Sequence, residues 1–396
     1  MIPMNSVLST RAIQIEASAT MAVGAKAKEL SSQGHDVINL GMGEPDFDTP
    51  EVIKAAATKA IRDGKTKYTM VDGIEPLKAA IVYKLKRDNQ LSYDLNQILV
   101  SDGVKQGIYN LCQAVLNPGD EVMIPAPYWV SYPPIVKLAE AQPVIIAADI
   151  KQRFKMTPAQ LEATITPKTR LLFLNSPSNP SGMAYTADEL KALGNVLIKH
   201  PHILIATDDI YEYILWSQKF VTLLNVCPEL KDRTIVFNGV SKAYAMTGWR
   251  IGYAAGPVEI IQGMKKIQSQ VTTCASSISQ AAAAAALAMD PNDLRYMLDA
   301  FKERHDIVYN AIHPIQAVPC LKSDGTFYSF IDVSAVIKRL GLKSDIDFAT
   351  YLLKEVNVAL VPGTAFGSPG HLRITFALGK ERLQEALDRM VPIFSK

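Results

Sequence analysis

The chain has 396 residues, of which 48% are hydrophobic and 20% charged, and its formal net charge is +2. This composition excludes a disordered chain, and the balanced charge gives no reason to expect a nucleic-acid partner. The 4 cysteines are far apart and form no C-x-x-C pair, which argues against a zinc site or a disulfide scaffold and fits a reducing compartment.

The N-terminal segment before Asp48 is predicted to be irregular, apart from an amphipathic helix near Val23–Gln33. The stretch from Met1 to Val23 contains no apolar core of the kind that a secretory signal needs. The most apolar run, Ala281–Met289, is far too short to span a bilayer. We therefore expect a cytoplasmic protein that does not enter a membrane.

In the middle of the chain, short apolar runs alternate with longer amphipathic segments. Near-continuous Val, Ile, Leu and Phe runs are typical of parallel strands that are buried on both faces, so the pattern predicts an α/β domain with a mostly parallel, seven-stranded sheet. The expected strands are Gln97–Val100, Glu121–Ile124, Pro143–Ala147, Arg170–Leu174, Ile203–Ala206, Thr234–Phe237 and Ile251–Ala255. The expected helices are Val104–Leu116, Ser131–Glu140, Ala187–His200 and Val258–Gln270.

The pattern changes after Ala281–Met289, where Asp290–Asp293 interrupts the chain. The rest mixes helices with a few strands and predicts a smaller α+β domain. We expect a large domain of residues 48–289 and a small domain formed by residues 1–47 and 290–396. Its expected helices are Leu294–Ile312, Asp345–Glu355 and Lys380–Met390, and its strands are Thr326–Asp332, Val358–Val361 and His371–Phe376.

Polar side chains follow three neighbouring strands of the expected sheet. They lie in the segments Asn175–Gly182, Thr207–Glu212 and Asn238–Arg250. Each alone is ordinary, because Asn-Pro-x-Gly commonly forms a turn and an aspartate after a strand commonly caps a helix. The carboxyl ends of parallel strands meet at one edge of a sheet, where such folds bind ligands. Together the segments therefore predict a functional site.

The segment Ser241–Arg250, with the sequence SKAYAMTGWR, resembles the pyridoxal-phosphate lysine signature of the class I aminotransferases. Asn-Pro-Ser-Gly at 179–182 and Asp-x-x-Tyr at 208–211 match that family in type, order and spacing, and the similarity extends from Gly41–Phe47 to Arg373. The bacterial aspartate aminotransferase subgroup, which includes aspartate/prephenate enzymes, is the most similar. The resemblance implies a fold-type-I transferase with pyridoxal 5'-phosphate as cofactor and no metal.

The resemblance also implies roles at the cofactor ring. Lys242 would bond covalently to the cofactor and later move the substrate proton. Asp208 would pair with the pyridine nitrogen, for which Asp209 is a neighbouring competitor. Tyr211 and Asn179 would hydrogen-bond the phenolic oxygen of the ring, and Trp129 would stack on the ring.

The cofactor phosphate needs a cradle of donors. The segment Ser101–Gln106 follows a strand and opens a helix, so its free N–H groups suit an anion. By resemblance the phosphate ligands would be Gly103, Val104, Lys105, Ser241 and Arg250, with Tyr68 supplied by a partner subunit. The last contact implies a homodimer with shared sites. Many family members have a serine where this chain has Gly239, and we expect Ser241 to compensate for it.

The substrate carboxylates are assigned by the same resemblance. Arg373 would clamp the α-carboxylate, assisted by the backbone of Gly43 and by Asn179 and Trp129. The region Ile267–Ser279 contains no arginine for a second carboxylate. Lys105, with Ser18 and Thr20 lining the same pocket, would take that role unless Lys105 only neutralises the phosphate.

The leading hypothesis is a transaminase that moves the amino group of an L-amino acid, most simply aspartate, to 2-oxoglutarate by a ping-pong mechanism. Alternatives within the family are an aromatic, prephenate or alanine preference. A β-lyase would use the same cofactor set, and a non-catalytic ligand-binding protein could keep the fold. A nicotinamide dehydrogenase is disfavoured, because Gly41-Met42-Gly43 lacks the third glycine and runs into Pro45.

Overall fold

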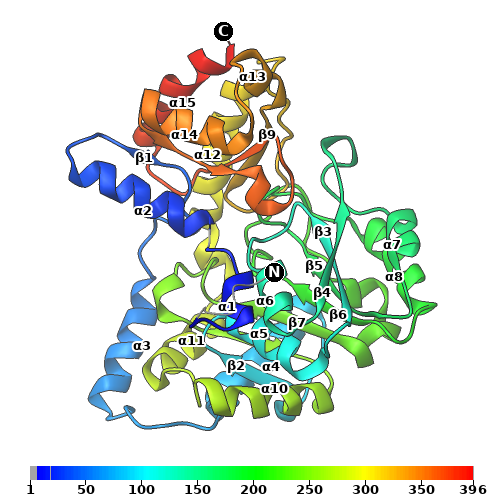
Figure 1. Ribbon diagram of the computed structural model, residues 1–396. Coiled ribbons are helices and arrows are strands. Elements are labelled where there is room, and N and C mark those ends of the chain that lie inside the picture. Colours follow the sequence, from blue (N-terminus) through cyan, green and yellow to red (C-terminus); the bar gives the residue numbers. More distant parts are fainter. Residues whose placement is uncertain (1–6, 18, 396) are drawn as a thin grey trace.

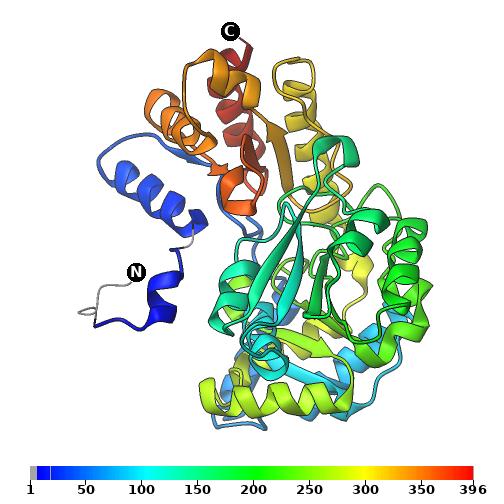
Figure 2. The ribbon, with the colours of Figure 1, turned by 45° about the vertical axis from the view of Figure 1, so that its right-hand side comes forward.

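The computed structural model describes residues 7–17 and 19–395. Two regions are visible: a large twisted sheet with helices on both faces, and a smaller region of helices and short strands that lies beyond one edge of that sheet (Figure 1). Helix α2 (Ala19–Ser32) lies beside the C-terminal helices in the smaller region (Figures 1 and 2). No helix of the described segments is long and apolar enough to cross a membrane.

The large sheet has seven strands in the order β2-β8-β7-β6-β5-β3-β4. All neighbours are parallel except β8, which runs antiparallel to β2 and β7. The strands are β2 (Ile98–Ser101), β3 (Glu121–Ala126), β4 (Gln142–Ala147), β5 (Thr169–Asn175), β6 (Leu204–Asp208), β7 (Thr234–Gly239) and β8 (Gly252–Ala255). The expected mostly parallel, seven-stranded α/β sheet is therefore confirmed.

The apolar runs form strands because both faces of the sheet are covered. Along β5, Leu172 and Leu174 pack in one core cluster, whereas Leu171 and Phe173 pack in the other. This alternation is the two-residue period of a strand buried on both sides. The covering helices are α3 (Glu51–Arg62), α4 (Glu75–Asn89), α5 (Val104–Val115), α6 (Tyr132–Leu138), α7 (Pro158–Thr164), α8 (Ala187–Ile198), α9 (Leu223–Val226), α10 (Val258–Val271) and α11 (Ser277–Ala288).

The smaller region contains a three-stranded antiparallel sheet, β11-β12-β9, and a two-stranded parallel pair, β1-β10. Its strands are β1 (Ile38–Asn39), β9 (Tyr328–Asp332), β10 (Val358–Ala359), β11 (Val361–Pro362) and β12 (His371–Thr375). Its helices are α12 (Arg295–Ile312), α13 (Ser334–Arg339), α14 (Asp345–Val356) and α15 (Lys380–Ser395), and the short α1 (Thr10–Gln14) precedes α2. The domain boundaries at residues 48 and 290 stay a prediction.

Two expectations for this region are corrected. The single strand expected at Val358–Val361 is two strands, because the chain leaves the pair with β1 after Ala359 and joins β12 at Val361. The last helix continues beyond Met390 to Ser395, although Pro392 lies inside it. The pairing of β1 with β10 also shows that the N-terminal segment packs on the C-terminal region, as expected.

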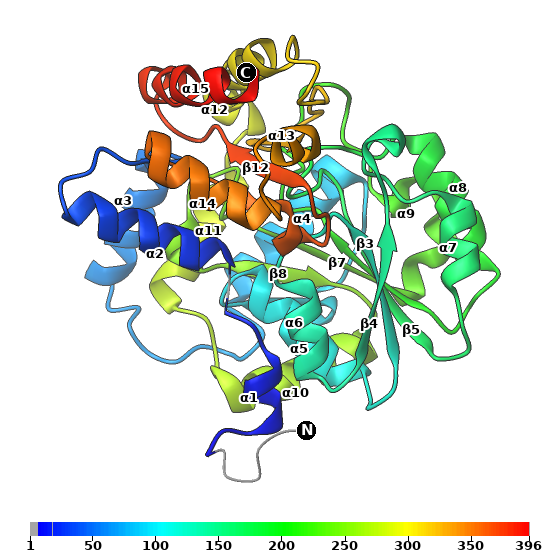
Figure 3. The same ribbon diagram turned by 45° about the horizontal axis from the view of Figure 1, so that its top comes forward.

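Backbone hydrogen bonds just before β9 join the seven-stranded sheet to the three-stranded sheet. The carbonyl oxygen of Gly182, after β5, accepts the N–H groups of Asp324 (2.9 Å) and Gly325 (3.0 Å). Thr326 N–H donates to Ile214 O at 2.7 Å, and a Cβ on Gly325 would lie only 2.3 Å from that oxygen. The junction therefore requires glycine at 325. It brings the start of β9 to the carboxyl edge of the large sheet, and β12, which pairs with β9, lies above that sheet in Figure 3.

Candidate active site

A pocket of about 390 Å³ lies where the carboxyl ends of the large sheet face β9 and β12. Twelve of the residues singled out from the sequence line it: Thr20, Gly43, Val104, Lys105, Trp129, Asn179, Asp208, Tyr211, Ser241, Lys242, Arg250 and Arg373. They come from segments more than 300 residues apart in the chain, so only the tertiary fold assembles them. The volume is typical of a site for a small molecule.

Lys242 follows the end of β7 and reaches into this pocket. Its Nζ donates a hydrogen bond to Gly43 O at 2.5 Å. Enclosure of the amine lowers the pKa of Lys242 to about 8, helped by the charges of Arg373 and Arg250 and opposed by Glu44 and Asp208. An amine with this pKa is partly neutral near pH 7–8, and therefore both nucleophilic and able to take up a proton.

Asp208 is the last residue of β6 and is buried. Its Oδ2 accepts a hydrogen bond from Tyr132 Oη at 2.7 Å, whereas Oδ1 has no partner among the described residues. Burial raises the pKa of Asp208 to about 6, although the bond from Tyr132 opposes the shift. A buried carboxylate oxygen without a partner at a pocket wall is suited to a cationic N–H group.

The neighbouring Asp209 does not line the pocket. Burial and the nearby charges of Glu212 and Asp208 raise the pKa of Asp209, and the charge of Lys84 opposes that rise. Lys84 and Glu212 form a buried ion pair behind the strand end. The geometry therefore favours Asp208 over Asp209 as the carboxylate that meets a bound ligand.

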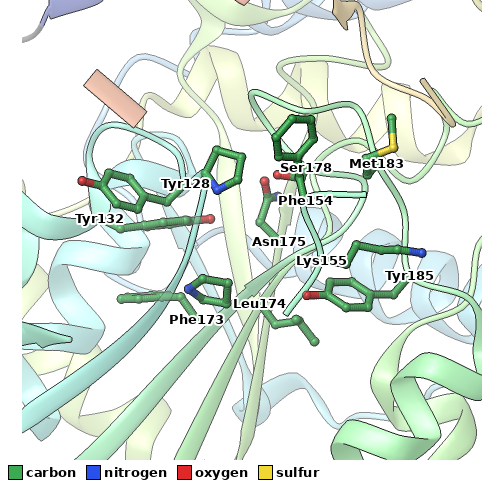
Figure 4. A pocket seen from close by; sticks show the side chains of 12 residues that line it. Tyr128, Tyr132, Phe154, Lys155, Phe173, Leu174, Asn175, Ser178, Met183 and Tyr185 are labelled. Atoms are coloured by element: carbon green, nitrogen blue, oxygen red, sulfur yellow. The ribbon is translucent and has the colours of Figure 1, made fainter. Parts of the chain in front are cut away.

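Aromatic and amide side chains support Asp208 from behind. Tyr132 stacks on Phe173 with ring centroids 4.6 Å apart, and Asn175 Nδ2 donates to Asp208 O at 2.8 Å. Tyr132, Phe173 and Asn175 line a small cavity of about 20 Å³, together with further aromatic side chains such as Tyr128 and Tyr185 (Figure 4). The Tyr132 hydroxyl is thus fixed in direction by ring stacking, and it fixes Asp208 in turn.

A cradle for an anion lies at the N-terminus of α5. Gly103, which precedes the helix, has φ +81°, and a Cβ there would lie 2.4 Å from Arg250 Nη2. A Cβ on Gly252 would lie 2.3 Å from Val104 N. Arg250 donates to Thr247 O (3.0 Å) and Asp102 O (3.2 Å), which places its guanidinium beside the free helix N–H groups. This combination of a cation with a helix N-terminus suits a phosphate.

Many members of the family that the sequence resembles have serine at the position of Gly239. Packing explains the glycine in this chain. A Cβ at this position would lie 2.9 Å from Ile251 O and 3.1 Å from Gly252 Cα. The close approach of β7 and β8 therefore favours glycine here. Ser241, two residues later, lines the pocket and can supply a hydroxyl.

Arg373 lies on β12, opposite Val361 of β11, and is buried. Its guanidinium donates to Asn179 Oδ1 (2.9 Å) and to Gly41 O (2.8 Å), and Nε has no partner among the described residues. Burial lowers the pKa of Arg373, although arginine stays charged in proteins. The protein thus holds a cation in the pocket with no carboxylate paired to it, which suits a carboxylate ligand.

Lys105 lies in the first turn of α5, and its Nζ is 5.1 Å from the centroid of the Trp129 ring. Burial and the charge of Arg250 lower its pKa. Trp129 in turn packs edge-on against Tyr132, with centroids 5.3 Å apart. The ammonium group therefore lies above the indole at the pocket wall, where it can reach a ligand as well as the cradle.

Two described site residues that the sequence predicts do not line this pocket. The Tyr68 side chain is 90% exposed, and Gly103 lies against Arg250. The expected Ser18 lies outside the described residues. Within residues 7–17 and 19–395, no group of three or more His, Cys, Asp and Glu side chains could hold a metal ion.

Several lining residues were not identified from the sequence, among them Glu44, Thr247 and Tyr328. Thr247 Oγ1 donates to Glu44 Oε2 at 2.9 Å and so links the lysine loop to the Gly43 segment. Tyr132 supports the site from outside the pocket. Tyr132 lies three residues after Trp129, which the resemblance assigns to the site, but no local signal marks Tyr328.

The sequence and the structure both match known proteins. Residues 35–390 match the family described as aminotransferase class I and II. The aspartate/prephenate aminotransferase of Nitrosomonas europaea is 53% identical over 395 residues, which cover 98% of this chain and 100% of that protein. The aspartate aminotransferase of Rhizobium meliloti is 47% identical over 388 residues, covering 96% of this chain and 95% of that one.

Solved structures show the same similarity. A crystal structure of the Rhizobium meliloti aspartate aminotransferase matches with a TM-score of 0.94 and 46% identity, covering 98% of each chain. The Thermus thermophilus aspartate aminotransferase with maleate matches with a TM-score of 0.92 and 38% identity, covering 98% of this chain and 100% of that one.

Proposed function

The chain belongs to the class I and II aminotransferase family, and from this premise we propose that it is a pyridoxal 5'-phosphate-dependent transaminase that moves the amino group of L-aspartate to 2-oxoglutarate. The observation that carries the proposal is one pocket in which the amine of Lys242, the unpartnered Oδ1 of Asp208 and the guanidinium of Arg373 converge.

The pocket fits the cofactor on the chemistry of its walls. Asp208 Oδ1 would pair with the ring N–H, and the N-terminus of α5 with Arg250 and Ser241 would hold the phosphate. Tyr211 and Asn179 would face the phenolic oxygen, with Trp129 against the ring. When bound, the cofactor supplies an electron sink for the charge left when the substrate loses its α-proton.

Lys242 has two tasks in this proposal. Its neutral amine would hold the cofactor covalently, and the same amine, when free, would carry the proton from the substrate α-carbon. The lowered pKa suits both tasks near neutral pH. Gly43 O, which accepts a hydrogen bond from Nζ, holds the amine at the pocket wall.

Aspartate carries two carboxylates, and the pocket offers two cations for them. Arg373, held by Asn179 and Gly41, would bind the α-carboxylate. Lys105, which lines the pocket as Thr20 does, would bind the side-chain carboxylate. A lysine is a point charge on a flexible stem, so acidic substrates of different length can pair with it. The pair of cations supports aspartate as the amino donor. The similarity to the aspartate/prephenate aminotransferase of Nitrosomonas europaea supports prephenate as a further substrate.

The β-lyase and binding-protein alternatives use the same residues. The binding-protein alternative predicts no amino transfer at all, and a β-lyase predicts loss of a β-substituent from the substrate. Product analysis after incubation with aspartate and 2-oxoglutarate distinguishes them, because only the transaminase yields oxaloacetate and glutamate together.

We also propose a homodimer with composite sites. Tyr68 is highly exposed in the single chain, as is Met70 at 66%. Tyr68 is outside the chain's own pocket, although the resemblance assigns it to a cofactor phosphate. Both facts fit a tyrosine that enters the site of a partner subunit.

The first prediction tests the site lysine. Borohydride treatment of the cofactor-loaded protein should fix the cofactor on Lys242, as found by peptide mass mapping. Lys242→Ala should lose transamination by several orders of magnitude, because the covalent link and the proton carrier are both removed. The exposed Lys219→Ala is the matched control and should keep full activity. A reduced adduct on another lysine would refute the assignment.

The second prediction tests the shared site. Subunits carrying Tyr68→Phe or Lys242→Ala are mixed and allowed to exchange, so that hybrids form. Each hybrid contains one undamaged site, and a statistical mixture should reach about a quarter of wild-type activity, above the mean of the two parents. A fully active monomer in sedimentation, or no gain on mixing, contradicts the composite site.

The third prediction concerns the second carboxylate. Lys105→Ala should lower kcat/KM for aspartate about ten- to a hundredfold, because one charge-assisted pair worth roughly 1.5–3 kcal/mol is lost. The value for alanine, which has no second carboxylate, should change little. If both donors lose equally, Lys105 serves the cofactor and not the substrate side chain.

A further inference from the structure

Two buried tyrosines meet inside the pocket. Tyr211 follows β6 of the large sheet, and Tyr328 begins β9 of the three-stranded sheet. Their hydroxyl oxygens are 3.2 Å apart, and the side chains are 3% and 0% exposed. The hydrogen bond therefore joins the two sheets at the pocket wall.

Tyr328 also contacts Arg373. The guanidinium carbon of Arg373 lies 4.3 Å from the centroid of the Tyr328 ring, a cation–π distance. A Cβ on Gly43 would lie 3.2 Å from Tyr328 Oη, so the hydroxyl also packs on the segment whose carbonyl accepts the Lys242 amine. The Tyr328 side chain thus contacts Arg373, Tyr211 and the Gly43 segment.

The number of protons on the two hydroxyl groups limits how Tyr211 and Tyr328 can hydrogen-bond. Burial raises the pKa of both phenols, so both are neutral near pH 7 and each has a single proton to donate. If Tyr328 donates to Tyr211, the Tyr211 proton is free to point into the pocket; if Tyr211 donates to Tyr328, it is not. The charged groups that face the pair are Arg373, Asp208 and Lys242.

The charge of Arg373 opposes the rise in pKa of both phenols, but its guanidinium carbon lies directly on the Tyr328 ring, 4.3 Å from the centroid. This closer contact favours Tyr328 as the proton donor, which would leave the proton of Tyr211 free for the pocket. A carboxylate bound to Arg373 would neutralise the charge and weaken this preference. Occupation of the carboxylate site would therefore change the hydrogen bonding of Tyr211.

We propose that Tyr328 is a positioning residue that orients the Tyr211 hydroxyl and couples it to the occupation of Arg373. The proposal deepens the proposed function and rests on it, since it assumes a cofactor bound to Lys242. Its effect is on the electronic state of that cofactor, which absorption spectroscopy measures without turnover.

The test compares wild-type holoenzyme with Tyr328→Phe, which removes only the hydroxyl and keeps the ring against Arg373. The readout is the pH midpoint at which the visible absorption band of the lysine-bound cofactor changes, without and with maleate, a dicarboxylate that is not an amino donor. Tyr253→Phe is the matched control, because its buried hydroxyl has no partner among the described residues.

In wild type, maleate should displace the midpoint. In Tyr328→Phe the midpoint without maleate should move by at least about half a pH unit, and the displacement by maleate should fall by half or more. Tyr253→Phe should match wild type in both. A Tyr328→Phe enzyme with wild-type midpoint and wild-type displacement would overturn the proposal.

A second comparison guards against a general disturbance of the pocket. Tyr211→Phe breaks the same hydrogen bond from the other side, so adding Tyr328→Phe to it should change the maleate displacement no further. An additional change in the double variant would mean that Tyr328 acts by another route, against the proposal. Failure of the proposed function has different signatures: wild-type protein would show no lysine-bound cofactor band, or it would show the band but form no oxaloacetate and glutamate from aspartate and 2-oxoglutarate.

Discussion

The enclosed amine of Lys242 is the constraint on which the rest of the site depends. The amine hydrogen-bonds a backbone carbonyl and, among the described residues, forms no ion pair. The neighbouring Arg373 and Arg250 both disfavour its charged form. Hydrogen bonds hold these two cations in place despite the repulsion between like charges. Arg373 donates to Asn179 and Gly41, and Arg250 donates to Thr247 and Asp102.

Much of the fold was predictable because local sequence reflects burial. The strands of the large sheet are covered on both faces, so their apolar runs are nearly continuous. Helices α3 and α4 were not expected. In α4 two polar residues, Lys84 and Asn89, are buried, because Lys84 pairs with Glu212 and Asn89 donates to the same carboxylate. The burial of these polar residues depends on a partner more than 100 residues away. The local pattern of apolar and polar residues therefore does not indicate which face of α4 is buried.

The site divides in the same way. Asp208 ends a strand, and Lys242 and the Asn179 turn follow strands, so their position was predictable from topology. Tyr132 and Tyr328 act through partners 76 and 117 residues away, Asp208 and Tyr211, and a single sequence gives no signal for such pairs. Tyr68 stays a prediction, because its role requires a second chain.

The most direct test of this account is the titration of Lys242 itself. In protein freed of cofactor, competitive labelling with acetic anhydride across pH, followed by peptide mass analysis, measures the neutral fraction of each lysine. Because the pKa is lowered, Lys242 should become reactive as the pH rises through about 8. Ordinary lysines should become reactive only at higher pH, since their pKa is about 10.4. A Lys242 midpoint equal to that of ordinary lysines would contradict the claim that the pocket holds this amine ready for chemistry at neutral pH.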